Sequence, residues 1–149
     1  MIDPNNDEPK RKLNLSFKEG LATFHGVWAA VDLITDFAIY RFLSVTPEQA
    51  HLITSGMMYG RKAQLLADLV GRSDHPKRDK ILGALNWIRG GAKRDIVTHG
   101  YHKQDENNIT FVQRSYSGEF KAVEHSFTNR EFRAHVLKLI ERGVSPQHT

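Results

Sequence analysis

The chain contains no cysteine among its 149 residues. This absence excludes a disulfide framework, a thiolate metal site and a cysteine nucleophile. The sequence also has no apolar run approaching the roughly 18 residues that a membrane-spanning helix needs. The stretch from Met1 to Lys12 is polar, of mixed charge, and has no signal-peptide core. We therefore expect a cytoplasmic protein with no membrane partner.

The composition is that of an ordinary globular domain, with 40% hydrophobic and 26% charged residues. A chain of this length suits one domain with one hydrophobic core. The sequence has neither internal repeats nor a linker that would divide two domains. We therefore expect a flexible N-terminal tail over residues 1–14, a single helical domain over residues 15–143 and a C-terminal tail over residues 144–149.

Positive charge is concentrated in the middle of the chain. Residues 72–95 contain seven lysines or arginines and three acids, so this segment has the same net charge, +4, as the whole protein. A basic surface suits phosphate-bearing partners, although a solvated helix face would have the same composition. The eight histidines are scattered and form no evident ligand set. We expect no metal and no cofactor.

Hydrophobic spacing and capping residues predict a mainly α fold, a bundle of four to five helices with a small β-hairpin before the last helix. The second and last helices begin with capping boxes, in Thr46–Gln49 and Thr128–Glu131. The spacing of Phe127 and Phe132 adds a hydrophobic staple to the last helix. The predicted helices cover residues 16–43, 46–56, 57–70, 74–99 and 128–143.

Two segments interrupt this helical pattern. The pair Gly90-Gly91 lies inside the fourth predicted helix, where each glycine costs about 1 kcal/mol relative to alanine, and it favours either a kink or the close approach of another backbone. After that helix, residues 102–108 are predicted as a polar loop. Alternating residues then predict two strands, 109–116 and 119–124, joined through Ser117-Gly118.

Residues 93–101 hold the best candidate site, at the end of the fourth predicted helix. Asp95 and His99 are four residues apart, so on a helix they share one face and the carboxylate can fix the imidazole tautomer. Arg94 lies about 140° around the helix from His99, at roughly 100° per residue. One helix would therefore splay these two groups, unless Gly100 ends the helix early and lets the histidine swing.

The order Arg94, Asp95, His99, Gly100 and Tyr101 resembles the HEPN superfamily (higher eukaryote and prokaryote nucleotide-binding). Its defining motif is Arg-x4–6-His, usually with a polar residue after the arginine. The extended Arg-x4-His-x-Tyr form of HEPN toxins also matches. The resemblance is clearest over residues 57–101, while the hairpin and the last helix are compatible with it but not diagnostic.

The spacing alone is a weak signal, because Arg130 with His135 and Arg142 with His148 match it too. The match at 130 falls in the first turns of the last predicted helix, whose start is already accounted for by the capping box Thr128–Glu131. The match at 142 extends into the C-terminal tail. Only residues 94–101 combine a preceding basic helix with a following glycine and tyrosine.

In catalytic members the resemblance implies metal-independent RNA cleavage that leaves a cyclic phosphate and a 5′-hydroxyl end. His99 would act as general base or acid on the ribose 2′-hydroxyl and the leaving oxygen, and Arg94 would neutralise the scissile phosphate. Asp95 would belong to the same catalytic group, with Arg89 and Lys93 as RNA contacts. The superfamily commonly dimerises, so that two motifs form one composite cleft. RNA and a second copy of the chain are therefore the expected partners.

In toxin members a cognate nucleotidyltransferase antitoxin can modify the matching tyrosine. Tyr101 is therefore a candidate regulatory or substrate-contacting residue, and such an antitoxin is a candidate partner. The resemblance implies an endoribonuclease of toxin–antitoxin or phage-defence type.

Two alternatives stay open. The first is a non-catalytic HEPN-like module that binds nucleotide, RNA or a partner protein. In that case Asp95 and His99 form only a helix-terminal pair, with the histidine favoured beside the negative end of the helix dipole. The second, a DNA-binding regulator, fits the size and basicity but lacks a clear recognition helix.

Overall fold

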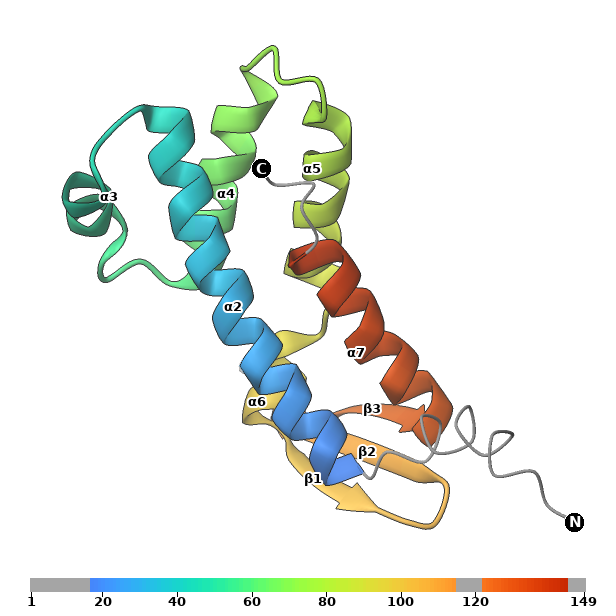
Figure 1. Ribbon diagram of the computed structural model, residues 1–149. Coiled ribbons are helices and arrows are strands. Elements are labelled where there is room, and N and C mark those ends of the chain that lie inside the picture. The colour runs from blue at the N-terminus through green and yellow to red at the C-terminus, as the bar shows by residue number, and fades with distance from the viewer. Residues whose placement is uncertain (1–16, 115–121, 145–149) are drawn as a thin grey trace, which may run out of the picture. The chain divides into compact units, whose positions relative to one another are not determined.

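The computed structural model describes residues 17–114 and 122–144 of the chain. The fold is mainly α with a small antiparallel sheet before the last helix, as predicted (Figure 1). Every described helix is too short or too polar to cross a membrane. The elements in chain order are α2 (Phe17–Leu43), α3 (Pro47–Thr54), α4 (Tyr59–Gly71), α5 (Arg78–Asn86), the π-helix η2 (Trp87–Gly91), α6 (Arg94–His99), β1 (Tyr101–Gln104), β2 (Asn108–Arg114), β3 (Ala122–Thr128) and α7 (Asn129–Gly143).

The described residues divide into two compact units. Unit 1 contains the chain up to His25 together with residues 93–138, and unit 2 contains residues 26–92 together with the chain from Leu139. Helices α2 and α7 each contribute turns to both units. The single domain expected over residues 15–143 stays a prediction.

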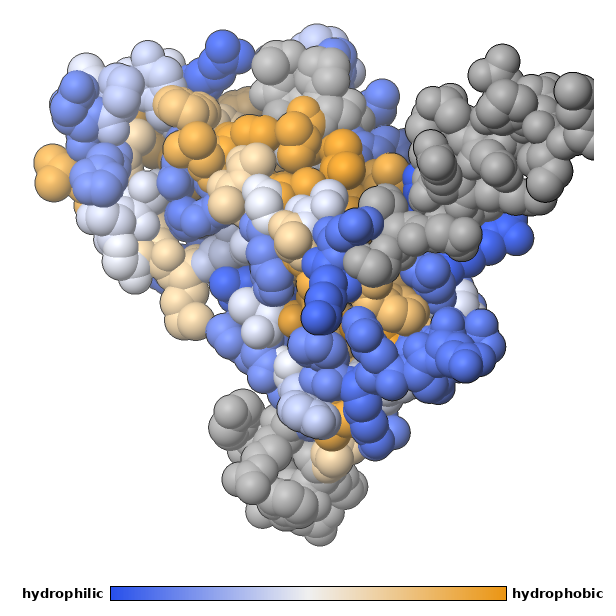
Figure 2. Space-filling view, turned by 60° about the horizontal axis from the view of Figure 1, so that its bottom comes forward, coloured by the Kyte–Doolittle hydropathy of each residue, from blue (hydrophilic) through white to orange (hydrophobic). Residues whose placement is uncertain are grey.

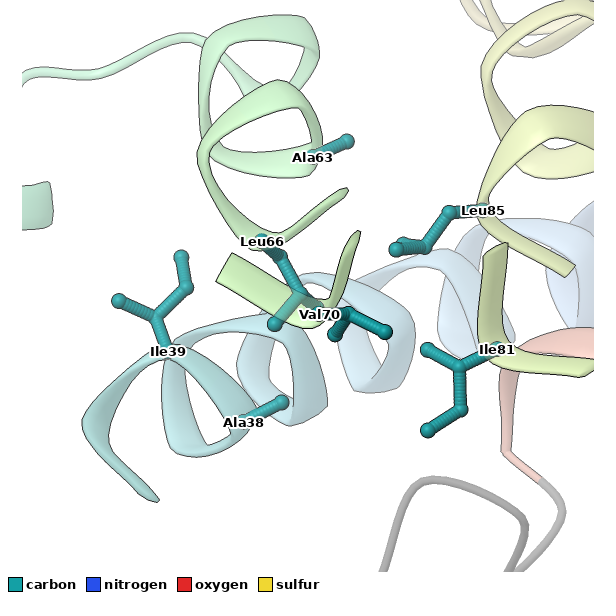
Figure 3. Close-up of a cluster of buried hydrophobic side chains, with 7 residues drawn as sticks. All are labelled: Ala38, Ile39, Ala63, Leu66, Val70, Ile81 and Leu85. Atoms are coloured by element: carbon teal, nitrogen blue, oxygen red, sulfur yellow. The ribbon is translucent and has the colours of Figure 1, made fainter. Parts of the chain in front are cut away.

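Unit 2 has a core of small and branched apolar side chains from α2, α4 and α5. The spacing of these side chains places them on one face of each helix. Figure 3 shows how they converge. The cluster consists of Ala38, Ile39, Ala63, Leu66, Val70, Ile81 and Leu85.

A buried cation joins α2 and α4 within this unit. Lys62 on α4 is 6% exposed, and its Nζ lies 2.5 Å from Asp32 Oδ1 and 3.1 Å from Asp36 Oδ1 on α2. The two aspartates are one helical turn apart, so both can reach the same ammonium group. Burial lowers the pKa of Lys62, but the hydrogen bonds and charges of the aspartates outweigh it and leave the pKa above its ordinary value.

The three strands of unit 1 form an antiparallel sheet in the order β1-β2-β3 (Figure 1). Phe111, in the central strand β2, is fully buried. Its ring lies 6.1 Å from that of Phe127 on β3 and 5.8 Å from that of Phe132 on α7. These aromatic contacts pack α7 against one face of the sheet.

The predicted loop over residues 102–108 is wrong, because β1 covers its first half. Asp105 closes the turn between β1 and β2, where its Oδ1 accepts hydrogen bonds from the backbone N–H groups of Asn107 and Asn108 at 2.9 and 2.8 Å. These bonds hold the pKa of the exposed Asp105 carboxyl below its ordinary value. The predicted hairpin is present as β2 and β3, although β3 continues to Thr128 instead of ending at residue 124. Its predicted turn at Ser117-Gly118 lies outside the described residues.

The single fourth helix predicted over residues 74–99 is also wrong. It begins later, at Arg78, and is split into α5, the π-helix η2 and α6. A Cβ atom at Gly91 would lie 2.5 Å from the ring of Trp87, so only glycine fits beneath that indole. Two residues later Lys93 adopts the left-handed conformation, with φ 57° and ψ 31°, which stops the right-handed helix. The expected kink is therefore a complete break.

Both capping boxes are confirmed. The hydroxyl of Thr46 accepts a hydrogen bond from the N–H of Gln49 at 3.2 Å, and the Gln49 side chain accepts one from the N–H of Thr46 at 3.0 Å. Thr128 and Glu131 make the same reciprocal pair, both at 3.1 Å. These bonds satisfy backbone donors that a helix start leaves unpaired. The staple is also present, since the rings of Phe127 and Phe132 lie 5.4 Å apart.

Tyr59 at the start of α4 has a buried hydroxyl next to the Lys62 site. Its oxygen lies 3.1 Å from Thr35 Oγ1, and the Thr35 hydroxyl donates to the carbonyl of Val31. Burial raises the pKa of Tyr59 to about 12, and the negative charge of Asp32 adds to the shift. The folded state therefore holds this proton more tightly than the unfolded chain does.

This difference predicts an alkaline loss of stability. Because the pKa of Tyr59 is higher in the folded state, its contribution to the free energy of unfolding is complete below pH 10. This contribution is lost as pH rises from 10 to about 12, which lowers the free energy of unfolding by about 2–3 kcal/mol. We expect Tyr59→Phe to remove this part of the decline in the free energy of unfolding, measured by urea denaturation at pH 9–12. Tyr101→Phe, at an exposed tyrosine, should keep the wild-type decline. Equal slopes for wild type and Tyr59→Phe would contradict the assignment.

Candidate functional site

The helix break makes Arg94 the first residue of a new short helix, α6. Asp95 follows it, and the Nη1 of Arg94 lies 3.5 Å from Asp95 Oδ1. The Arg94 side chain is 32% exposed and the Asp95 side chain 79% exposed. A long ion pair in such contact with water contributes little to stability.

His99 is the last residue of α6 and is exposed. Gly100 ends the helix directly after it, with its N–H donating to the carbonyl of Ile96 at 2.9 Å. His99 therefore stays within the helix, five residues from Arg94. At helical geometry this separation is about 140° around the axis and roughly 9 Å between the two Cα atoms. The two side chains therefore point in different directions from α6, as expected for residues on one helix.

Asp95 and His99 also lie within this helix, four residues apart. The ion pair that Asp95 forms is with Arg94, and the interactions of the described residues include none between Asp95 and His99. The role of Asp95 in fixing the imidazole tautomer therefore stays a prediction.

Tyr101 begins β1, and the strand register places it on the exposed face of the sheet. It pairs with Val112 on β2, whereas its neighbour His102 pairs with the buried Phe111. Successive side chains of a strand point to opposite faces, so Tyr101 points away from the aromatic core, and it is 72% exposed. Lys103, two residues on, shares this face and pairs with Thr110.

The two predicted RNA contacts lie in different units. Lys93 belongs to unit 1, directly before Arg94, and Arg89 belongs to the π-helix in unit 2. Both side chains are exposed. The charge of Arg89 also acts on Tyr59, whose pKa it lowers against the larger effect of burial.

The structure adds a basic feature that the motif did not indicate. An open cavity of about 790 Å³ in unit 2 is lined by residues 71–80, the segment between α4 and α5. It contains four bases and two acids, so its charge is positive. Arg78 is held there by a hydrogen bond from its Nε to the carbonyl of Gly71 at 3.0 Å. The unequal charge of residues 72–95 was the sequence signal for this feature.

The second Arg-x4-His match lies on α7 in a different environment. Arg130 is exposed in the first turn, whereas His135 is half-buried. The His135 ring stacks on Phe24 at 6.2 Å and lies 5.1 Å from Phe127. His148, of the third match, lies outside the described residues. Of the two motif histidines within the described residues, His99 and His135, only His99 is exposed at a helix end.

Comparison with protein-family models, with curated proteins and with solved structures gives no significant match for this chain. The resemblance to the HEPN superfamily therefore stays a prediction that rests on the residues of the motif. Within the part of the chain that the structure describes, no three His, Asp or Glu side chains gather in a way that could hold a metal ion.

Gly100 joins the helix of the motif to the strand that carries Tyr101, and its lack of a side chain is required there. A Cβ atom at this position would collide with the Ile96 carbonyl oxygen and lie 3.3 Å from the Val112 carbonyl oxygen. Both are backbone atoms, so neither can move without shifting α6 or β2. We expect Gly100→Ala to lower the free energy of unfolding by about 1–3 kcal/mol.

The measurement is urea denaturation followed by circular dichroism, with Gly83→Ala as the matched control. Gly83 lies inside α5, and nothing lies within 4 Å of a Cβ placed there. Alanine should stabilise that helix by up to about 1 kcal/mol. A Gly100→Ala variant as stable as the wild type would disprove the close approach of α6 and β2.

Proposed function

We propose that this chain is a HEPN-type, metal-independent endoribonuclease whose active site combines residues from two copies. The observation that carries the proposal is the placement of Arg94 and His99 at the two ends of one surface helix, with Tyr101 directly after it. Eight residues of chain thus supply three groups for the reaction. Arg94 is a cation for the phosphate, His99 is an imidazole for proton transfer, and Tyr101 is an aromatic ring. Lys93 and Arg89 add exposed positive charge for the RNA backbone.

In the proposed reaction an imidazole of His99 removes the proton of the ribose 2′-hydroxyl. The 2′-oxygen attacks the phosphorus and the bond to the 5′-oxygen breaks, so the products are a 2′,3′-cyclic phosphate and a 5′-hydroxyl. The guanidinium of Arg94 stabilises the charge that grows on the phosphate oxygens. The ordinary pKa of imidazole, roughly 6.5, suits both accepting and returning a proton near neutral pH.

The splay of the motif supports a site made by two copies. Because Arg94 and His99 point about 140° apart on α6, one copy does not direct both groups at one phosphate. Two copies related by a twofold axis can place the arginine of one beside the histidine of the other.

Exposed apolar side chains provide surface for such an association. Leu33 and Phe37 lie one turn apart on α2 and are 56% and 51% exposed. Figure 2 shows that hydrophobic side chains gather in one area of the visible face, while hydrophilic side chains cover much of the remainder. Neighbouring exposed apolar side chains such as Leu33 and Phe37 are suited to an interaction site.

The proposal includes regulation of toxin–antitoxin or phage-defence type. The tyrosine that a nucleotidyltransferase antitoxin would modify must present its hydroxyl to the partner's active site. Tyr101 is 72% exposed on the open face of the sheet, which supports this role.

A second candidate is a non-catalytic module that binds RNA. The observation that favours it is the excess of bases over acids in residues 72–95, seven against three. Binding of this kind is expected to weaken steeply with salt. Cleavage distinguishes the two candidates, because only the first breaks the RNA strand.

We expect the wild-type protein to cleave a mixed RNA pool in the presence of EDTA. His99→Ala should reduce the rate about 10²–10⁴-fold, because general acid–base catalysis contributes that much. Arg94→Ala should reduce it about 10²–10³-fold through lost transition-state stabilisation. The readout is gel analysis of end-labelled RNA, with chemical identification of the cyclic phosphate.

Two controls accompany this experiment. Arg130→Ala removes the arginine of the second Arg-x4-His match, and His51→Ala removes an exposed histidine of α3. Both should cleave like the wild type, and circular dichroism should show that every variant is folded. Activity unchanged by His99→Ala would refute the proposed catalytic site, and salt-sensitive binding without cleavage would identify the second candidate.

A composite site also makes a complementation prediction. When Arg94→Ala and His99→Ala subunits are mixed, a mixed dimer contains one site with an intact arginine and an intact histidine. Activity should therefore return, to at most about half of the wild-type rate because only one of two sites is intact. A mixture as inactive as its two components would show that each copy uses its own Arg94 and His99.

A further inference from the structure

A groove separate from the α6 motif lies between β3 and α7 in unit 1. It is shallow and open to solvent, with a volume of about 400 Å³. One side comes from the strand and the other from the first three turns of the helix. The lining residues are His125, Ser126, Phe127, Glu131, Ala134, His135 and Lys138.

Aromatic rings form much of this lining. The His125 ring lies 4.5 Å from the Phe127 ring at an interplanar angle of 71°, and the His135 ring lies 5.1 Å from Phe127 at 48°. Both imidazole rings therefore lie close to the same phenyl ring, and the distance between the two imidazoles is at most the sum of their distances to Phe127. Phe24 stacks behind His135 at 6.2 Å with an angle of 11°. The groove is thus bounded by flat rings whose positions are fixed by the aromatic core.

The polar groups of the groove come mainly from one face of α7. Glu131, His135 and Lys138 are at positions i, i+4 and i+7, which lie above one another on a helix. The small side chain of Ala134 leaves room beside them. One oxygen of Glu131 already accepts the N–H of Thr128 at 3.1 Å in the capping box. The lining thus contains two imidazoles, one ammonium group and one carboxylate, and an oxygen of that carboxylate is engaged in the capping box.

We propose that this groove binds a planar aromatic ring that carries an anionic group, a carboxylate or a phosphate. The ring would lie among the imidazole and phenyl rings, where stacked and edge-to-face arrangements are favourable. The anionic group would lie toward Lys138 and the imidazole N–H groups. A metal ion is the less suitable ligand, since the described residues offer no cluster of three ligating side chains. The site does not depend on RNA cleavage by α6.

The test titrates the full-length protein with phenyl phosphate, followed by isothermal calorimetry and by NMR of the histidine rings. We expect saturable binding that shifts the signals of His125 and His135. His135→Gln and Lys138→Gln should each weaken it about tenfold, as expected for the loss of one hydrogen bond to a charged group. Lys138 is exposed, so its variant tests the site even if His135→Gln unfolds the protein.

Two further variants sharpen the test. His102 on β1 pairs with Phe111 on β2, and Phe111 pairs in turn with His125 on β3, so His102 lies on the same sheet face as His125. It does not line the groove. His102→Gln should bind like the wild type. Glu131→Gln keeps a capping box, because glutamine serves there as well as glutamate, and it removes the one negative charge. We expect this variant to bind phenyl phosphate more tightly.

The ligand series decides the chemistry. Cyclohexyl phosphate should bind about tenfold more weakly than phenyl phosphate, and equal binding would overturn the aromatic requirement. Benzylamine should not bind, and tighter binding of this cation, weakened by Glu131→Gln, would overturn the anionic requirement. The absence of saturable phenyl phosphate binding would overturn the proposal. Nucleoside monophosphates that bind more tightly than phenyl phosphate would identify a nucleotide as the source of the ring and the anion.

Discussion

The indole ring of Trp87 occupies the space that any side chain at position 91 would need, so Gly91 is required there. The backbone widens into a π turn at this point, and Lys93 then adopts a left-handed conformation that costs a non-glycine residue roughly 1–2 kcal/mol. A right-handed helix cannot continue through such a residue. This break makes Arg94 the start of a new helix on the surface, and the candidate site depends on it.

The histidines of unit 1 lie in two different surroundings, and each kind of surroundings suits a different role for the imidazole. His99 ends a short helix in contact with water, where an imidazole is accessible to a substrate and to a second copy of the chain. His125 and His135 pack against Phe127 and line a groove with flat walls. The first setting suits proton transfer, and the second suits recognition of a ring. The Arg-x4-His spacing by itself does not separate them.

Several elements could be predicted because their causes are local. The capping boxes at Thr46 and Thr128 follow from side chains three residues away. Helical spacing within the fourth predicted helix likewise indicates its buried residues, which are Ile81, Leu85, Ile88, Ala92 and Ile96. The glycine pair indicated an interruption of the fourth predicted helix, but a complete break could not be predicted, because the left-handed conformation of Lys93 has no local sequence signal. Strand β1 has no buried residue, so hydrophobic alternation could not indicate it, although the turn residues Asp105 and Asn107 were a usable signal.

The mainly α fold, the order of the motif residues and the positive charge before them follow from local sequence, because propensity, capping and composition act over a few residues. How these residues are presented depends on tertiary contacts. Pairing with β2 places Tyr101 on the open face of the sheet, and the break before Arg94 leaves it and His99 at opposite ends of α6. Strand pairing and close packing join residues that are distant in sequence, and no local pattern encodes such contacts.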